Sequence, residues 1–353
     1  MISILESIKQ DYLKSTDEII RFIDLINLCK SQDLSFAHNS KFYNRIKTSM
    51  DSIKEHLSAT INAQYNAIII SLYGSFERAI KQATNTFIKY CIQNSFCLAS
   101  KFSSDYISSA FKTVDRRHLK ENKAIIQDLH LFFNENDITK FRSDISLQNY
   151  QNLRIDVIRS IANSIELPDP FDKVKKTDDF LCYIQARQAL SSKDQARLYV
   201  DRINIDNAFQ YIDNIVASRN QIAHEGRTDN RYDDTTLKEF VIKEFTIFVC
   251  QYIELLKDSW YIHCVKSNKM IEKLNILKVF NNQIICFNTG ENLINKKSII
   301  IIKKGNDKYE IASIESIRHN KVDIDCSTVN QNIGCALTKT CKITFKYYLY
   351  LQQ

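Results

Sequence analysis

Two side chains that could act together on an anionic group lie five positions apart in the middle of the chain. Arg219 and His224 are separated by four residues, and the polar Asn220 directly follows the arginine. A guanidinium matches the geometry of a phosphate group, and an imidazole can take up or release a proton near neutral pH. The segment therefore carries the residue types for binding an anion and transferring a proton beside it.

The hydrophobic pattern of this stretch predicts a helix that holds these side chains. Arg219 falls on the same helical face as a set of apolar residues: Ile212, Ile215, Val216 and Ile222. Its guanidinium is therefore expected against the core, where a partly buried arginine must be paired or bind an anion. Asn220 and His224 are four positions apart and share a face. Gly226 is placed to end the helix in the left-handed conformation.

The segment Arg219-Asn220-Gln221-Ile222-Ala223-His224 resembles the R-x(4–6)-H signature of the HEPN superfamily. It is most similar to the branch called RiboL-PSP-HEPN or MAE-like, whose wider pattern adds a buried helix ending in Phe-Glu and a middle helix. The corresponding stretches are residues 72–77, which end in Phe76-Glu77, and residues 152–158. The resemblance covers roughly residues 1–262.

This resemblance implies a metal-independent endoribonuclease that needs no cofactor and leaves 2′,3′-cyclic phosphate ends. It further implies a homodimer, in which two copies of the Arg–His pair meet in one cleft. The residues that it places in the catalytic site are Arg219, Asn220, His224 and Glu77.

Each of these residues also has a structural interpretation. His224 could be hydrogen-bonded at a helix end, and Asn220 could hold a loop. Arg219 could form an ion pair with Glu77, which would orient it across the bundle, or Glu77 could be a solvated helix charge. The corresponding alternative function is a non-catalytic HEPN module that binds RNA or a partner protein, or a regulatory subunit whose nuclease lies elsewhere.

The elements around this segment divide the chain into two domains. Residues 1–264 have helical periodicity, with helices expected to about residue 30, across 42–92 with an interruption near 58–60, and over 120–134, 153–165, 192–219 and 234–261. A polar break is expected at residues 35–40, and the two prolines mark a boundary at residues 168–170. Residues 265–353 contain short β-branched and aromatic runs between turn signals. The sequence thus predicts a mainly α HEPN-type bundle followed by a small, barrel-like all-β domain.

The basic charge is concentrated in the second domain. The chain has a net charge of +7, and residues 265–353 hold 14 Lys and Arg against 7 Asp and Glu, which accounts for the whole excess. The residues predicted to contact RNA there are Lys296, Lys297, Lys303, Lys304 and Tyr348. Lysines that protect edge strands from aggregation would give the same pattern, and so would a surface for docking a partner.

Composition excludes several function classes. With 5 Gly, the chain has neither a Rossmann nor a P-loop phosphate-binding motif. The 10 cysteines form no C-x-x-C pair, so we expect reduced thiols rather than a metal site or a disulfide framework. We also expect no membrane-spanning segment and no leader, and therefore a cytoplasmic protein. A bacterial toxin or anti-phage effector would fit, with an antitoxin or defence-complex protein as partner.

Overall fold

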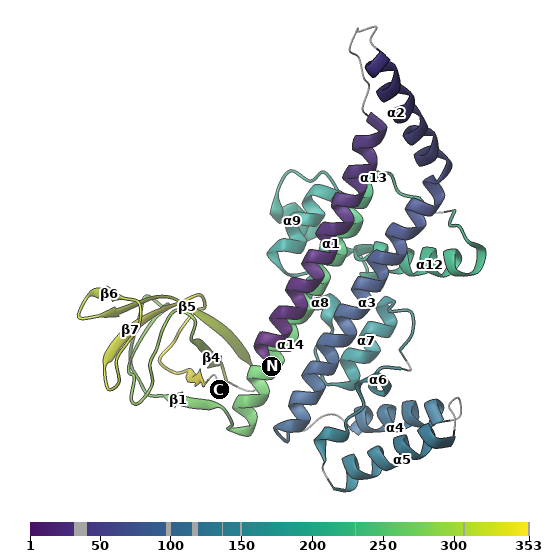
Figure 1. The fold of residues 1–353 in the computed structure, drawn as a ribbon. Helices are drawn as coiled ribbons and strands as arrows, with labels where there is room; N and C mark the ends of the chain where they lie inside the picture. Colours follow the sequence, from purple (N-terminus) through teal and green to yellow (C-terminus); the bar gives the residue numbers. More distant parts are fainter. Residues whose placement is uncertain are drawn as a thin grey trace. The chain divides into compact units, whose positions relative to one another are not determined.

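The chain forms a helical unit followed by a curled antiparallel β-sheet, as the sequence predicts (Figure 1). The computed structural model describes residues 1–31, 41–96, 100–114, 119–135, 137–148, 150–229, 231–305 and 308–351. Its two compact units are Met1–Leu256 and Lys257–Gln353. The boundary predicted at residues 264 and 265 lies within α14 (Lys243–Ser267).

Long helices open the helical unit. α1 spans Ile2–Ser31, α2 spans Lys41–Ala59 and α3 spans Ile61–Gln93. The predicted interruption near residues 58–60 is confirmed, because Thr60 separates α2 from α3. The polar break predicted at residues 35–40 lies outside the described residues. The shorter elements that follow are α4 (Ser100–Val114), α5 (Leu119–Asn134), η1 (Ile138–Lys140), α6 (Ser143–Ser146), α7 (Ile155–Ser164), α8 (Pro170–Val174) and α9 (Asp178–Arg187).

The core of this unit forms around α3, which is apolar over most of its circumference. Leu72, Phe76 and Ile80 on α3 have no exposed surface, and α1 lies alongside the same helix. Phe76 packs edge-to-face on Phe245 of α14, with ring centroids 4.7 Å apart. The burial of such aromatic side chains is the main force that holds α3 in the centre of the bundle.

The predicted single helix over residues 192–219 is wrong. This stretch instead contains α10 (Lys193–Arg202), α11 (Ile205–Ala208) and the first part of α12 (Gln210–Glu225). Asn204 starts α11 by accepting a hydrogen bond from the Asn207 backbone N–H at 2.8 Å, and such local capping competes with a continuous helix. After α12 come α13 (Asp234–Thr236), a π-helical turn over Leu237–Ile242, and α14.

The second unit is an antiparallel sheet that curls on itself. Its strands are β1 (Ile271–Leu274), β2 (Ile276–Phe280), β3 (Ile284–Asn288), β4 (Ile299–Lys303), β5 (Tyr309–His319), β6 (Val322–Ile324), β7 (Asn332–Leu337) and β8 (Lys346–Tyr350). Their order is β1-β8-β4-β5-β7-β3-β2, with β6 beside β5. Only Asn275 separates β1 from β2, so the two ends of the strand order are continuous in the chain.

The curled sheet encloses an apolar core. Fully buried side chains from several strands fill it, among them Phe287, Ile300, Ile302 and Tyr347. On the opposite face of β8, Tyr350 accepts a hydrogen bond from the Trp260 indole N–H at 3.2 Å. The end of α14 therefore covers part of the outer face of this sheet.

Candidate functional site

The helix α12 carries three of the four predicted catalytic residues, Arg219, Asn220 and His224. Ile212, Ile215 and Val216 are fully buried, and Arg219 on the same face is half-buried. The helix ends at Gly226, as predicted, with a φ of +73° and a hydrogen bond from its backbone N–H to the Ile222 carbonyl at 2.9 Å. A left-handed residue at this position favours glycine, which lacks a Cβ.

Two contacts fix the guanidinium of Arg219. Its central carbon lies 5.4 Å from the centre of the Tyr73 ring on α3, so the charge rests against an aromatic face. Its Nη1 donates a hydrogen bond to Asn220 Oδ1 at 3.0 Å. Because Asn220 shares its side of the helix with His224, the second contact draws the guanidinium toward the histidine side.

Tyr73 is a site residue that the sequence analysis missed. Its hydroxyl accepts a hydrogen bond from the Leu153 backbone N–H at 3.0 Å, which ties the segment before α7 to α3. Burial raises the pKa of Tyr73 to about 12, so the phenol is neutral at physiological pH. A signal was present in the sequence, since Tyr73 lies one helical turn before Glu77 and so shares its face.

Glu77 pairs with a lysine of its own helix. Its carboxylate forms an ion pair with Lys81 on the same helix, with Oε1 and Nζ 2.8 Å apart. Among the described residues no ion pair joins it to Arg219. The charge of Glu77 raises the pKa of Tyr73, and the charge of Arg219 lowers it.

His224 is exposed and makes no hydrogen bond or ion pair with any described residue. The helix end that carries it is nevertheless held in place. Asn66 on α3 donates a hydrogen bond to the Gly226 carbonyl at 2.7 Å, and the Gln221 amide binds Asp229 at 3.0 Å. The imidazole is thus presented from a fixed position and is free to bind a ligand or a second molecule.

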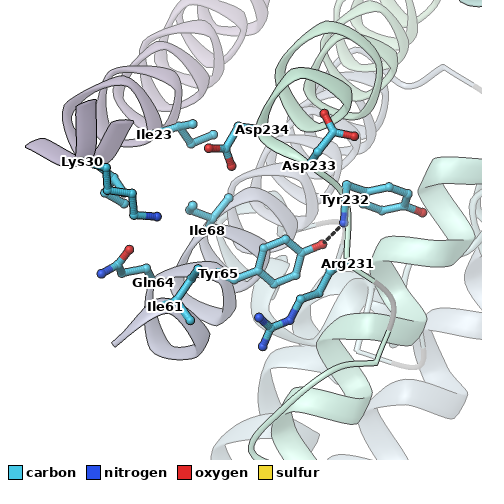
Figure 2. A pocket seen from close by; sticks show the side chains of 11 residues that line it. Ile23, Lys30, Ile61, Gln64, Tyr65, Ile68, Arg231, Tyr232, Asp233 and Asp234 are labelled. Carbon is cyan, nitrogen blue, oxygen red and sulfur yellow. Dashed lines mark hydrogen bonds between the residues drawn. The ribbon is translucent and has the colours of Figure 1, made fainter. Parts of the chain in front are cut away.

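A cavity of about 300 Å³ is lined in part by residues 231–234, which follow α12 in the chain. Figure 2 shows its walls, which come from α1, α3 and the loop between α12 and α13. Tyr65 forms one wall, and its hydroxyl accepts a hydrogen bond from the Tyr232 backbone N–H at 3.1 Å. Lys30 and Asp234 lie at its polar rim. Tyr65 lines this cavity, and Asn66, the next residue of α3, binds the Gly226 carbonyl. The same turn of α3 therefore contacts both the cavity and the end of α12.

A buried hydrogen-bond network, also missed from the sequence, holds the other end of α12. Glu244 on α14 has no exposed surface and accepts a hydrogen bond from the Tyr211 backbone N–H at 3.0 Å. Arg187 donates to the Glu244 carboxylate at 3.2 Å and to the Ala208 carbonyl at 3.0 Å, and Tyr183 donates to the same carboxylate at 2.8 Å. Burial raises the pKa of Glu244 to about 8.

The chain matches the model of the RiboL-PSP-HEPN family over residues 11–261. The chain belongs to the RiboL-PSP-HEPN family. No curated protein and no solved structure matches the sequence. Membership in the HEPN superfamily suggests a nuclease or an RNA-binding module. The match ends at residue 261, before the first strand of the β unit begins at Ile271.

The residues predicted to bind RNA in the β unit do not form one group. Lys296 precedes β4 and lies 3.6 Å from the Asp325 carboxylate, and Lys297 is its neighbour at the same end of the strand. Lys303 and Lys304 lie at the other end of β4. Tyr348 is half-buried on the face of β8 that it shares with Tyr350, where the end of α14 packs.

The part of the chain that the structure describes also bears on metal sites, disulfides and membrane-spanning helices. No group of three or more His, Cys, Asp or Glu side chains there could hold a metal ion. The cysteines that the structure describes are unbridged, and Cys97 lies outside the described residues. No described helix combines the length and apolar character that crossing a membrane requires.

Proposed function

We propose that this HEPN chain is a metal-independent endoribonuclease whose active site is completed in a homodimer. The observation that carries the proposal is the arrangement on α12. A half-buried guanidinium is fixed over Tyr73 and by Asn220, and an exposed imidazole lies beyond it on the same helix. The first group is suited to a phosphate and the second to proton transfer.

In the proposed reaction, the ribose 2′-oxygen attacks the adjacent phosphorus. The 2′-O–P bond forms and the P–O5′ bond breaks, which leaves a 2′,3′-cyclic phosphate and a 5′-hydroxyl. A base must take the 2′-hydroxyl proton, an acid must protonate the leaving 5′-oxygen, and Arg219 would stabilise the charge on the phosphorane.

One histidine cannot be both base and acid in a single step. A twofold dimer supplies two copies of His224 and two of Arg219 to one cleft. The exposure of His224 supports this arrangement, because the imidazole is accessible to a second copy of the chain. Asn220 would orient the guanidinium, and Glu77, which pairs with Lys81 on α3, would contribute negative charge to the site.

Cleavage of total RNA in EDTA by wild type, His224→Ala and Arg219→Ala tests the proposal. We expect the wild type to leave 2′,3′-cyclic phosphate and 5′-hydroxyl ends, and each variant to lose at least about 100-fold in rate. Thermal unfolding and dimer content should match the wild type. Variants that cut as fast as the wild type, or wild-type activity that EDTA abolishes, would overturn the assignment.

The alternative is a non-catalytic module that binds RNA or a regulatory partner. The contacts of Arg219 with Tyr73 and Asn220 would also serve a purely structural role. In that case a folded wild type cuts no RNA, and Arg219→Ala lowers the free energy of unfolding without changing RNA binding.

We further propose a bacterial toxin or anti-phage defence role for the nuclease, with an antitoxin or defence-complex protein restraining it in the cytoplasm. Expression in a bacterial host tests this role. Wild type should arrest growth and His224→Ala should not, whereas equal growth of the two strains would contradict a toxic nuclease.

A further inference from the structure

One end of the β unit concentrates positive charge from segments far apart in the sequence. Lys303 at the end of β4 and Lys346 at the start of β8 are directly paired in the sheet. Lys304 and Lys308 belong to the adjoining β4–β5 turn, which a backbone hydrogen bond between them closes at 2.8 Å. Lys342 precedes β8, where the Tyr347 hydroxyl holds its backbone. We call these five lysines the basic end.

Carboxylates balance part of this charge. Glu310 pairs with Lys304, and Asp307 lies between Lys304 and Lys308 in the sequence. Five lysines against two carboxylates leave a net charge of +3, and a surface of net positive charge attracts a polyanion.

Protection of a sheet edge does not explain these lysines. Such lysines occur on strands that would otherwise pair with another chain. β4 lies between β8 and β5, and β8 lies between β1 and β4, so both strands are internal to the sheet. This arrangement removes the main alternative that the sequence left open for Lys303.

Aromatic rings lie among the ammonium groups. Lys303 Nζ is 5.3 Å from the centre of the Tyr309 ring, and Lys304 Nζ is 5.6 Å from the centre of the Phe345 ring. Both rings are only half-buried. Lysines that follow a backbone beside rings on which bases can stack are the elements of single-stranded nucleic-acid binding.

We propose that the basic end binds the phosphate backbone of single-stranded RNA, with Tyr309 and Phe345 as stacking surfaces. The choice of RNA over another polyanion rests on the nuclease function proposed above. The basic end includes Lys303 and Lys304 from the residues predicted from the sequence, together with Lys308, Lys342 and Lys346. It does not include Lys296 and Lys297, which lie at the opposite end of β4.

The test compares two double variants of the full chain, each in the His224→Ala background so that RNA stays intact. Lys303→Gln with Lys346→Gln removes the facing pair. Lys296→Gln with Lys297→Gln removes equal charge from the opposite end of β4. Binding of a fluorescent 20-nucleotide RNA is measured by anisotropy from 50 to 200 mM salt.

We expect the facing-pair variant to bind about tenfold more weakly at low salt. Its salt slope should be smaller by about 1.4, which is about 0.7 for each of two phosphates that the lysines no longer neutralise. The control variant should bind like the parent. Equal binding and equal slopes in the two variants would overturn the proposal, as would binding to phosphatidylserine vesicles but not to RNA.

The same two double variants are also made in a chain that keeps His224. Cleavage of a ribodinucleotide by these chains separates this proposal from the nuclease function. A ribodinucleotide occupies only the Arg219–His224 site, so its cleavage should be unchanged by Lys303→Gln with Lys346→Gln. If no chain cuts the dinucleotide but the salt slope still falls, the nuclease proposal fails and the RNA-binding surface stands.

Discussion

At the scale of single residues, Tyr73 has two separable roles beside Arg219. Its ring supports the guanidinium, and its hydroxyl accepts the Leu153 N–H. Tyr73→Phe keeps the ring and leaves a buried N–H without an acceptor, which should lower the free energy of unfolding by about 1–3 kcal/mol. Tyr73→Leu removes both contacts. Urea unfolding and RNA cleavage of the two variants measure these effects.

We expect Tyr73→Phe to cleave RNA at nearly the wild-type rate per folded molecule, and Tyr73→Leu to cleave at least about tenfold more slowly, because the guanidinium loses its aromatic support. If both variants cleave at the same rate, the ring does not position Arg219. The contact would then contribute to stability alone.

At the scale of elements, both ends of α12 are held by α3 and α14. Asn66 binds its last turn, and Glu244 accepts the Tyr211 N–H at its first turn. The Glu244 carboxyl has a pKa of about 8 in the folded chain against an ordinary value of 4.5. Between these pH values the folded chain binds one proton more than the unfolded chain. Stability should therefore fall as pH rises from about 5 to 8, by at most about 1.4 kcal/mol for each pH unit.

Urea unfolding of wild type and Glu244→Gln at several pH values between 5 and 8.5 tests this. The variant should be less stable at low pH, since it alters the network around Arg187, and it should lack the wild-type decline. The difference between the two curves isolates Glu244 from other titrating groups. Parallel curves would mean that Glu244 is ionised throughout, stabilised by Arg187 and its hydrogen-bond donors.

The sequence predicted correctly those helices whose apolar pattern and terminating residues match the way they pack in the structure. The apolar stripe of α12 and its end at Gly226 are confirmed, and so is the interruption at Thr60. The sequence predicted strands at residues 284–287, 298–302, 309–317, 322–326 and 342–351, and it missed β1, β2 and β7. β7 includes Gly334 and carries few β-branched side chains. Tyr73 and Glu244 were missed because their partners are more than 30 residues away in the sequence. A local sequence pattern does not predict such contacts.

At the scale of the whole molecule, the sheet of the β unit shows why the spatial grouping of lysines differs from their grouping along the chain. Lys303 and Lys346 lie 43 positions apart and meet only through the β4–β8 register. The lysines predicted to contact RNA were two neighbouring pairs along the chain, and β4 separates Lys297 from Lys303 by its full length. Contacts set by strand order require the topology, and β-strand order was not predictable from periodicity.

Subunit mixing measures how many chains contribute His224 to one active site. His224→Ala chains are exchanged with wild type at equal concentrations, with total protein held constant. If each site needs His224 from both copies, only wild-type dimers cleave, and random exchange leaves about a quarter of the activity rather than about half. Mixing with Lys296→Gln and Lys297→Gln chains, which keep His224, serves as the control and should leave the activity unchanged. If the cleavage activity instead falls in proportion to the fraction of His224→Ala chains, each copy cuts alone. The exposed imidazole would then act on its substrate without a second copy.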